Sequence, residues 1–225
     1  MSDNFFQVAI DGPAASGKST VARLLAGRIG GYYINTGDMY RTLAWQALEK
    51  GVDAANDPAG VVALLASNDV RYRIVDGKPL LHLNGTPVPQ AEIRKPEVSA
   101  IVSHVAKIPE LRTWMLEKQR ECRELGIIIM EGRDIGTVIF PDAKFKFFVT
   151  ASPMERARRR LAQAGEVAAG ATLESVAADI ARRDEIDSTR PVAPLKPAED
   201  AKFVMTDGFT AEEIADQLAE AIRSK

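Results

Sequence analysis

A phosphate-binding pattern lies near the start of the chain, in the stretch GPAASGKST from Gly12 to Thr20. Its glycines allow the backbone to curl so that successive N–H groups point inward, and Lys18 and Ser19 follow at the spacing G-x-x-x-x-G-K-[ST]. At a helix N-terminus, such a loop binds a polyphosphate, with the lysine at the β and γ phosphates and the hydroxyl on Mg²⁺. The pattern predicts a nucleoside triphosphate site with Mg²⁺. An ordinary glycine-rich turn is the alternative.

A second set of charged residues follows the loop, in the segments NTGDMYR, EGRD and RRDEIDSTR. The set comprises Thr36, Arg41, Glu131, Arg133, Asp134, Arg183, Asp187 and Arg190. The last three are spaced i, i+4, i+7, which on a helix is one face. Several cations can neutralise two anionic substrates, and carboxylates can select the second of them. We therefore expect phosphoryl transfer to an acceptor that is itself a phosphate. A nucleotide-driven switch is the non-enzymatic alternative, although a switch does not need this second set.

The surrounding pattern indicates strands that alternate with helices. An apolar run at 5–10 precedes the loop, and helical spacing follows it over 17–30. Alternating residues at 70–89, with turn signals at 76–77 and 84–85, predict a small antiparallel piece. Apolar runs predict strands at 126–134 and 143–151, and periodicity predicts helices at about 39–50, 97–122 (broken near Pro109), 152–163, 172–185 and 210–224. This alternation is typical of an α/β protein whose parallel sheet is covered by helices on both faces.

Length and composition limit the class of protein. With 225 residues and 46% hydrophobic content, the chain fits one domain with insertions. The net charge of -2, from 29 basic and 31 acidic residues, argues against nucleic acid and a membrane surface as partners. A single cysteine, Cys122, and two histidines exclude a disulfide framework and a Cys/His metal cluster. No apolar run approaches the roughly 20 residues of a membrane span. We expect a cytoplasmic protein, and a monomer because no heptad or long apolar stripe is present.

Six segments in order resemble those of bacterial cytidylate kinases, which belong to the nucleoside monophosphate kinase group. They are DGPAASGKST, NTGDMYR, LNGTPVPQAEIRKPEVS, HVAKIPELR, EGRDIGTVIFPDA and RRDEIDSTRPVAPL, between about residues 8 and 200. The resemblance implies one kinase domain, 1–225, with a three-layer P-loop core. It also implies a nucleoside monophosphate (NMP)-binding insertion at 36–112, with its antiparallel piece at about 69–90, and a short helical lid at 155–182. The implied activity is ATP-dependent phosphorylation of CMP and dCMP; a broader UMP/CMP kinase is the alternative.

The resemblance also implies residue roles. The implied ATP-binding residues are Gly12, Pro13, Ala14, Ala15, Ser16, Gly17, Lys18, Ser19 and Thr20, with lid arginines Arg156 and Arg160. The implied CMP-binding residues are Thr36, Tyr40, Arg41, Ser103, Arg112, Arg133, Asp134, Arg183, Asp187 and Arg190. The implied catalytic residues are Lys18, Arg41, Arg133 and Arg190. Ser19 would ligate Mg²⁺, and Glu131 would hold it through water. A carboxylate at Asp134 can accept a hydrogen bond from the exocyclic amine of cytosine and would repel the carbonyl of uracil.

Other interpretations of these residues stay open at this stage. Arg41 and the arginines around Arg156 and Arg160 could be solvated surface residues, Ser103 a helix residue without a ligand, and Glu131 the partner of a nearby arginine. Tyr40 could pack or could stack on a base. His82, His104, Cys122, Trp45 and Trp114 are interpreted as structural, with Trp45 and Trp114 in the core or lining the cleft.

Two positions depart from the family pattern. Asn35 stands where Asp is frequent, and Asp38 stands where a small residue is more common. A carboxylate at Asp38 that pointed at the acceptor phosphate would weaken its binding. We therefore expect Asp38 to face solvent or to pair with a neighbouring cation.

Overall fold

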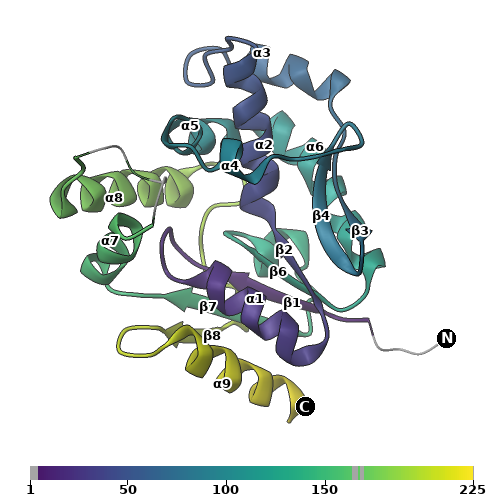
Figure 1. Cartoon of the computed structure of the whole chain (residues 1–225), viewed down its shortest axis with the longest axis vertical. Coiled ribbons are helices and arrows are strands. Elements are labelled where there is room, and N and C mark those ends of the chain that lie inside the picture. The colour runs from purple at the N-terminus through teal and green to yellow at the C-terminus, as the bar shows by residue number, and fades with distance from the viewer. Residues whose placement is uncertain (1–4, 164–166, 168–169, 225) are drawn as a thin grey trace.

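The computed structural model describes residues 5–163, 167 and 170–224, and its centre is a five-stranded parallel sheet (Figure 1). The strand order is β2-β6-β1-β7-β8. In this order the strands span Tyr32–Asn35, Ile128–Gly132, Gln7–Asp11, Phe145–Thr150 and Lys202–Met205. The register aligns Asp11 of β1 with Gly132 of β6, so the loops after these two central strands leave the same edge side by side. Ligands of open parallel sheets bind at this edge.

Helices cover both faces of this sheet, as the sequence predicts. On one face, α1 (Lys18–Ile29) and α9 (Ala211–Arg223) bury Leu25 and Leu218 against the strands. Thr210 and Glu213 begin α9 with a capping box, in which each side chain accepts from the other residue's backbone N–H. The other face is covered by short helical turns, η2 (Glu121–Leu125) and η3 (Ile135–Ile139), and by the fully buried Phe140.

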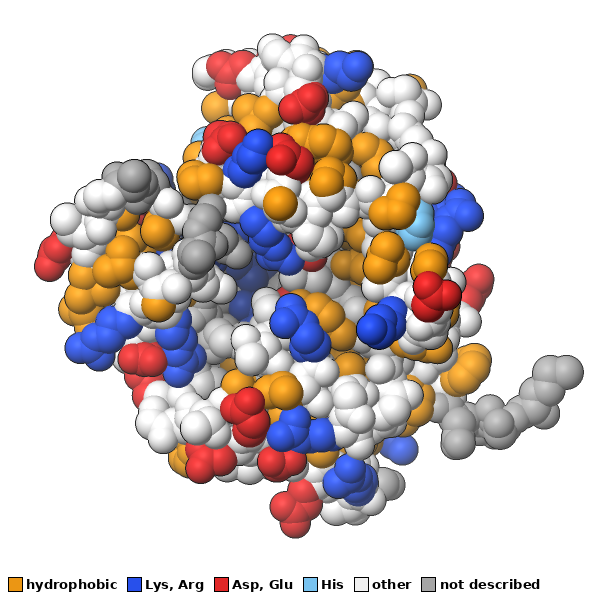
Figure 2. Space-filling model, in the orientation of Figure 1, with side chains coloured by type: hydrophobic (Ala, Val, Ile, Leu, Met, Phe, Trp, Pro, Cys, Tyr) orange, Lys and Arg blue, Asp and Glu red, His pale blue; other side chains and the backbone are white. Residues whose placement is uncertain are grey.

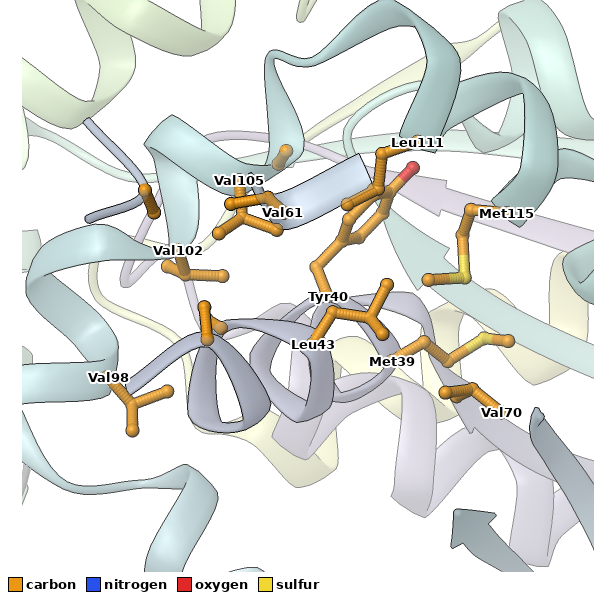
Figure 3. Close-up of a cluster of buried hydrophobic side chains, with 14 of the residues drawn as sticks. Met39, Tyr40, Leu43, Val61, Val70, Val98, Val102, Val105, Leu111 and Met115 are labelled. Carbon is orange, nitrogen blue, oxygen red and sulfur yellow. The ribbon is translucent and has the colours of Figure 1, made fainter. Parts of the chain in front are cut away.

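A second hydrophobic core lies among a set of helices and short strands in the middle of the chain (Figure 3). The helical elements are α2 (Thr36–Glu49), α3 (Pro58–Ala63), η1 (Leu64–Ser67), α4 (Gln90–Ile93), α5 (Pro96–Ala106) and α6 (Pro109–Arg120). The strands β3 (Val70–Val75), β4 (Lys78–Leu83) and β5 (Thr86–Pro87) form a separate antiparallel sheet. Met39, Leu43 and Met115 meet in this core at 0–1% exposure, which fixes α2 against α6.

The predicted turns and helix break in this region are confirmed. Asp76 and Gly77 have φ of 50° and 73°, and Asn84 and Gly85 have 51° and 81°, as tight hairpin turns require. Pro109 starts α6 directly after α5, because proline fits the first helical turn but interrupts a helix interior.

Two further helices, α7 (Pro153–Leu161) and α8 (Leu173–Thr189), pack on each other beside the phosphate loop. Their contact buries Ala157, Val176 and Ile180 together with Ala14 of that loop. The lid expected at 155–182 includes 164–166 and 168–169, which lie outside the described residues.

Several elements differ from the sequence prediction. The strands β2 and β8 are not predicted by the pattern, and neither are α3 and α4. The helix expected from Met39 starts at Thr36, because the Asn35 side chain caps it by accepting from the Asp38 N–H at 3.3 Å. The helix expected to end at Glu185 continues to Thr189.

Candidate functional site

The loop after β1 curls tightly against the neighbouring strand. Gly12 has φ of 150°, and a Cβ there would lie 2.0 Å from the carbonyl oxygen of Val149 in β7, so only glycine fits. At the other end, Gly17 has φ of 89° and precedes the first residue of α1. The loop therefore ends at a helix N-terminus, where backbone N–H groups and the helix dipole favour an anion.

Lys18 lies over this loop rather than in solvent. Its Nζ donates to the Pro13 carbonyl at 2.5 Å and to the Ser16 hydroxyl at 3.2 Å, and the residue is 5% exposed. Burial, followed by the charge of Arg133, lowers the pKa of Lys18 well below its ordinary value. Glu131 and Asp184 act in the opposite direction, and a phosphate beside Lys18 would add to their effect and favour its charged form.

A cavity of about 760 Å³ runs from the loop to the helices of the second core. Figure 2 shows Lys and Arg side chains gathered in a hollow near the middle of this face. The predicted site residues that line the cavity are Ala15, Ser16, Gly17, Lys18, Ser19, Thr20, Thr36, Tyr40, Arg41, Ser103, Arg112, Glu131, Arg133, Asp134, Arg160, Arg183, Asp187 and Arg190. Gly12, Pro13, Ala14 and Arg156 do not line it. Segments far apart in sequence thus meet at one site.

Arginines crowd the middle of the cavity. Burial is the largest cause that lowers the pKa of Arg183 to about 9, and those of Arg41 and Arg160 to about 10; repulsion between these arginines and Arg133 adds to it. The Nε of Arg183 is buried and has no hydrogen-bond partner among the described residues. Arg133 differs, because Asp187 accepts from its Nε at 2.9 Å and raises its pKa against the effect of burial. Such a cluster is suited to a multiply charged anion.

One end of the cavity holds a carboxylate between two arginines. Arg112 donates to one oxygen of Asp134, and Arg190 Nη2 lies 3.5 Å from the other. The Arg112 guanidinium also lies over the Tyr40 ring, 5.4 Å from its centroid. Arg190 follows the last turn of α8 in an extended conformation, so the expectation that it shares a helix face with Arg183 is wrong.

The residues expected to hold Mg²⁺ are suited to that ion. Ser19 and Glu131 both line the cavity, and Glu131 is 3% exposed. The hydroxyl of Tyr33 donates to Glu131 Oε1 at 2.5 Å. Mg²⁺ prefers oxygen ligands and keeps several waters, so one hydroxyl and one carboxylate suffice from the protein. Among the described residues, no cluster of three or more His, Cys, Asp or Glu side chains could hold a metal by itself.

The arginines of α7 lie in two places, outside the phosphate loop and in the cavity lining. Arg156 donates to the Ala14 carbonyl at 3.1 Å and pairs with Asp184, so it binds the outside of the phosphate loop. Arg159, which the sequence did not single out, lines the cavity and donates to Thr206 Oγ1 at 2.7 Å. Its contact with the Ser16 carbonyl, at 3.3 Å, joins α7 to the loop. The basic run ERARRR indicated that arginines of this helix could act at the site, but the sequence could not show which of them face the cavity.

Asp38 is buried at 6% exposure and pairs with Arg94, whose Nη2 lies 2.7 Å from Asp38 Oδ1. The expected pairing with a cation is therefore found, and exposure to solvent is not. Burial raises the pKa of Asp38 to about 6, although Arg94 and Arg41 act in the opposite direction.

Asp11 is a buried carboxyl that sequence reasoning missed. It ends β1 and accepts from the N–H groups of Ile135 and Gly136, both at 2.8 Å. These bonds fix the start of η3, directly after Arg133 and Asp134. Burial raises the pKa of Asp11 to about 7.

The residues interpreted as structural do not line the cavity. His82 is 6% exposed on β4, and its Nδ1 lies 3.0 Å from the Leu80 carbonyl. Cys122 is 3% exposed in η2, and burial raises the pKa of its thiol to about 12. Trp45 and Trp114 are half-buried against the second core.

A parallel sheet whose first strand leads into a glycine-rich phosphate loop and then a helix defines the P-loop class of α/β proteins. Comparison with known proteins gives the family. The family model described as cytidylate kinase matches residues 8–224. The chain is 43% identical over 224 residues to a cytidylate kinase from Geobacillus sp. (strain WCH70), covering 99% of this chain and 98% of that protein. It is also 43% identical over 217 residues to one from Pelotomaculum thermopropionicum, covering 96% and 95%. The chain belongs to the cytidylate kinase family.

Among the described residues, no helix is both long and apolar enough to cross a membrane.

Proposed function

We propose that this chain transfers the γ-phosphoryl group of ATP to the phosphate of CMP or dCMP. One observation carries the proposal: the phosphate loop, the arginine cluster and the Asp134 carboxylate all line a single cavity. The loop would bind the triphosphate. Arg41 and Arg133 would bind the acceptor phosphate, and Asp134, paired with Arg112, would bind the cytosine. Membership of the cytidylate kinase family supports the same assignment.

The remaining site residues have roles consistent with this order. Arg183 and Asp187 would contact the sugar, Arg190 the phosphate and base, and Ser103 the base. Thr36 fixes the edge of the pocket, because its hydroxyl donates to the Glu131 carbonyl at 2.9 Å. Residues 36–112 would form the acceptor-binding insertion, and 155–182 the lid. Arg160, which lines the cavity, would act on the phosphates, while Arg156 would position the loop.

The reaction needs no protein nucleophile or general base, because the acceptor phosphate is already anionic. Ser19, and Glu131 through water, would hold Mg²⁺, which would supply charge neutralisation at the ATP phosphates. Lys18 and the arginines stabilise charge on the transferred group and align donor and acceptor. Closure of the insertion and lid would exclude water that otherwise hydrolyses ATP. We propose in addition that the chain acts on free nucleotides as a cytoplasmic monomer.

Initial rates of ADP formation with CMP, dCMP, UMP and AMP test this function. ADP formation should be much faster with CMP or dCMP than with ATP alone. UMP should accelerate it much less, because Asp134 would face the uracil carbonyl. Equal rates with UMP and CMP would identify a broader pyrimidine kinase. ADP formation that no monophosphate accelerates would reject the kinase and favour an ATP-binding switch.

A further inference from the structure

The helical turn η3 follows directly after Arg133 and Asp134, the residues of the β6 loop that line the cavity. The carbonyl of Asp134 accepts from the N–H groups of Val138 at 2.9 Å and of Ile139 at 3.2 Å. The position of the Asp134 backbone therefore depends on where the turn lies. A turn of five residues leaves its first N–H groups and last carbonyls without partners inside the turn, and it is not stable by itself.

Asp11 binds the first end of η3. Its Oδ1 accepts from the Ile135 N–H and its Oδ2 from the Gly136 N–H, both at 2.8 Å. A carboxylate also suits the positive end of a helical turn, and at 4% exposure little water can compete with Asp11 for these donors. Because Asp11 ends β1 directly before Gly12, the turn is held by the strand from which the phosphate loop leaves.

Arg120 binds the other end of η3. Its Nε donates to the Ile139 carbonyl at 3.1 Å, and its Nη2 donates to the Val138 carbonyl at 3.0 Å. A guanidinium suits the last carbonyls, where the turn is negative. Arg120 is the last residue of α6, and Arg112, which donates to the Asp134 carboxylate, lies on the same helix. One helix therefore holds both the Asp134 side chain and the far end of the turn that fixes its backbone.

We propose that Asp11 and Arg120 are positioning residues for recognition of the base. By binding opposite ends of η3, they hold Asp134 where it distinguishes cytosine from uracil. This inference rests on the proposed function, since it concerns the same acceptor site. Neither residue lines the cavity, so an effect of either on the choice of nucleotide must act through the turn. In the competing explanation, their bonds only tie β1 and α6 to η3 and contribute to stability.

Two variants remove these bonds from opposite ends of the turn. Asp11→Asn keeps the shape of the side chain, but only one of its two terminal atoms can still accept, so one N–H of η3 loses its partner. Arg120→Met removes both donors and keeps an apolar stem. The matched controls are Asp142→Asn and Arg73→Met, which make the same changes at exposed residues. The assays are run at pH 8, above the value of about 7 to which burial raises the pKa of Asp11, so that its carboxyl is ionised in the wild type.

The quantity to measure is the ratio of kcat/KM for CMP to kcat/KM for UMP. This ratio should fall by about tenfold in each variant, because a displaced Asp134 no longer separates the amine of cytosine from the carbonyl of uracil. Both controls should keep the wild-type ratio. The KM for ATP should stay within about twofold of the wild type in Arg120→Met, since the bonds it loses go to η3.

A wild-type ratio in folded Asp11→Asn and Arg120→Met would overturn the inference even if their Tm falls, because the bonds would then contribute only stability. A KM for ATP that rises as much as the ratio falls would also overturn it, since the effect would not be confined to the acceptor. Thermal melting reports whether each variant is folded. If Asp11→Asn does not fold, Arg120→Met, at a half-buried residue, tests the inference alone.

A second background tests whether the effect acts through Asp134. Asp134→Asn should itself lower the ratio, and in that background Asp11→Asn and Arg120→Met should lower it by less than about twofold more, since the residue that they position no longer selects the base. An undiminished effect there would reject positioning of Asp134. Failure of the proposed function would appear in the wild type itself, as a ratio near one or as no ADP formation with either nucleotide, whereas failure of this inference appears only in the variants.

Discussion

A mutation of Lys18 should affect catalysis and stability in different ways. It lies at the phosphate loop, where transferred charge must be stabilised, but its burial and the nearby Arg133 oppose its positive charge. Lys18→Met should therefore lower kcat by about 10²–10³-fold, while the free energy of unfolding stays the same or rises. Steady-state kinetics and urea unfolding check the two parts.

Lys78→Met, at an exposed lysine on β4, is the control. A Lys18→Met protein that unfolded easily would show that Lys18 stabilises the loop in the absence of nucleotide. A folded Lys18→Met protein with nearly normal turnover would remove Lys18 from the mechanism.

Tyr33 is a second residue whose role depends on a partner, because its hydroxyl donates to Glu131 Oε1 at 2.5 Å. Tyr33→Phe removes this bond and leaves the carboxylate less well oriented. The Mg²⁺ concentration for half-maximal rate should rise by about three- to tenfold, with the KM for CMP unchanged. Titration of activity with Mg²⁺ at fixed ATP measures this. Tyr32→Phe, one residue earlier on β2, should leave the Mg²⁺ dependence at its wild-type value.

Residues within the motifs were predictable from the sequence, and residues that support them from a distance were not. Lys18, Arg41 and Arg133 stand in segments whose spacing identifies them. Tyr33 and Glu131 are 98 positions apart, and Arg159 is 143 positions from the Ser16 carbonyl that it contacts. Such pairs exist only once the sheet order is set, and the sequence pattern does not contain that order.

At the scale of elements, Asp11 ties the end of β1 to the start of η3 and makes stability depend on pH. Its pKa is raised from 3.8 to about 7 in the folded protein. Between these values the folded state binds more protons than the unfolded state, so this carboxyl lowers the free energy of unfolding as the pH rises. Asp11→Asn should make that slope less negative by up to about 1.4 kcal/mol per pH unit.

Urea unfolding of the wild type and of Asp11→Asn, from about pH 4.5 to 7.5, gives both slopes. Asp142→Asn, at an exposed aspartate before β7, is the control and should leave the slope unchanged. Parallel curves for the wild type and Asp11→Asn would show that Asp11 has an ordinary pKa.

Gly12 lies so close to β7 that a larger residue there should destabilise the protein. Gly12→Ala would place a methyl group 2.0 Å from the Val149 carbonyl oxygen, so the loop or the strand must move. The variant should lose roughly 2 kcal/mol or more of stability and most of its ATP binding. Gly27→Ala, where a Cβ meets nothing within 4 Å, is the matched control in α1 and should not be destabilised. A stable Gly12→Ala that binds ATP normally would contradict the tight packing.

Among the elements, the long periodic helices and the apolar central strands were predictable, and the short edge strands were not. The strand β2 has four residues with two tyrosines, and β8 has four residues with Phe203 and Met205 exposed. Strands this short have too few residues to show a period, and their pairing with β6 and β7 defines them.

At the scale of the whole molecule, three packed regions each contribute a cation to the cavity. Lys18 comes from the sheet edge, Arg41 from the second core and Arg183 from α8. Their mutual repulsion and burial make the protein without ligand less stable than it would be with an anion bound. A ligand at about 100 times its Kd should add about 2.7 kcal/mol to the free energy of unfolding.

Thermal melting in increasing CMP, in ATP·Mg²⁺ and in both together measures this effect. Both nucleotides should raise the Tm, and inorganic phosphate should raise it less. Arg183→Met should raise the Tm of the protein without ligand and reduce the additional stabilisation by CMP. A Tm that nucleotides leave unchanged would indicate that they bind outside this cationic cavity.

The burial of Cys122 has a practical consequence for observing motion in this protein. Its thiol is 3% exposed and has a pKa of about 12, so almost none of it is thiolate at neutral pH. Maleimide dyes react with thiolates, and the native chain should therefore remain unlabelled. A pair of cysteines introduced on α3 and α8 could carry fluorophores with no need to replace Cys122, and energy transfer between them would follow the opening and closing of the cavity during turnover.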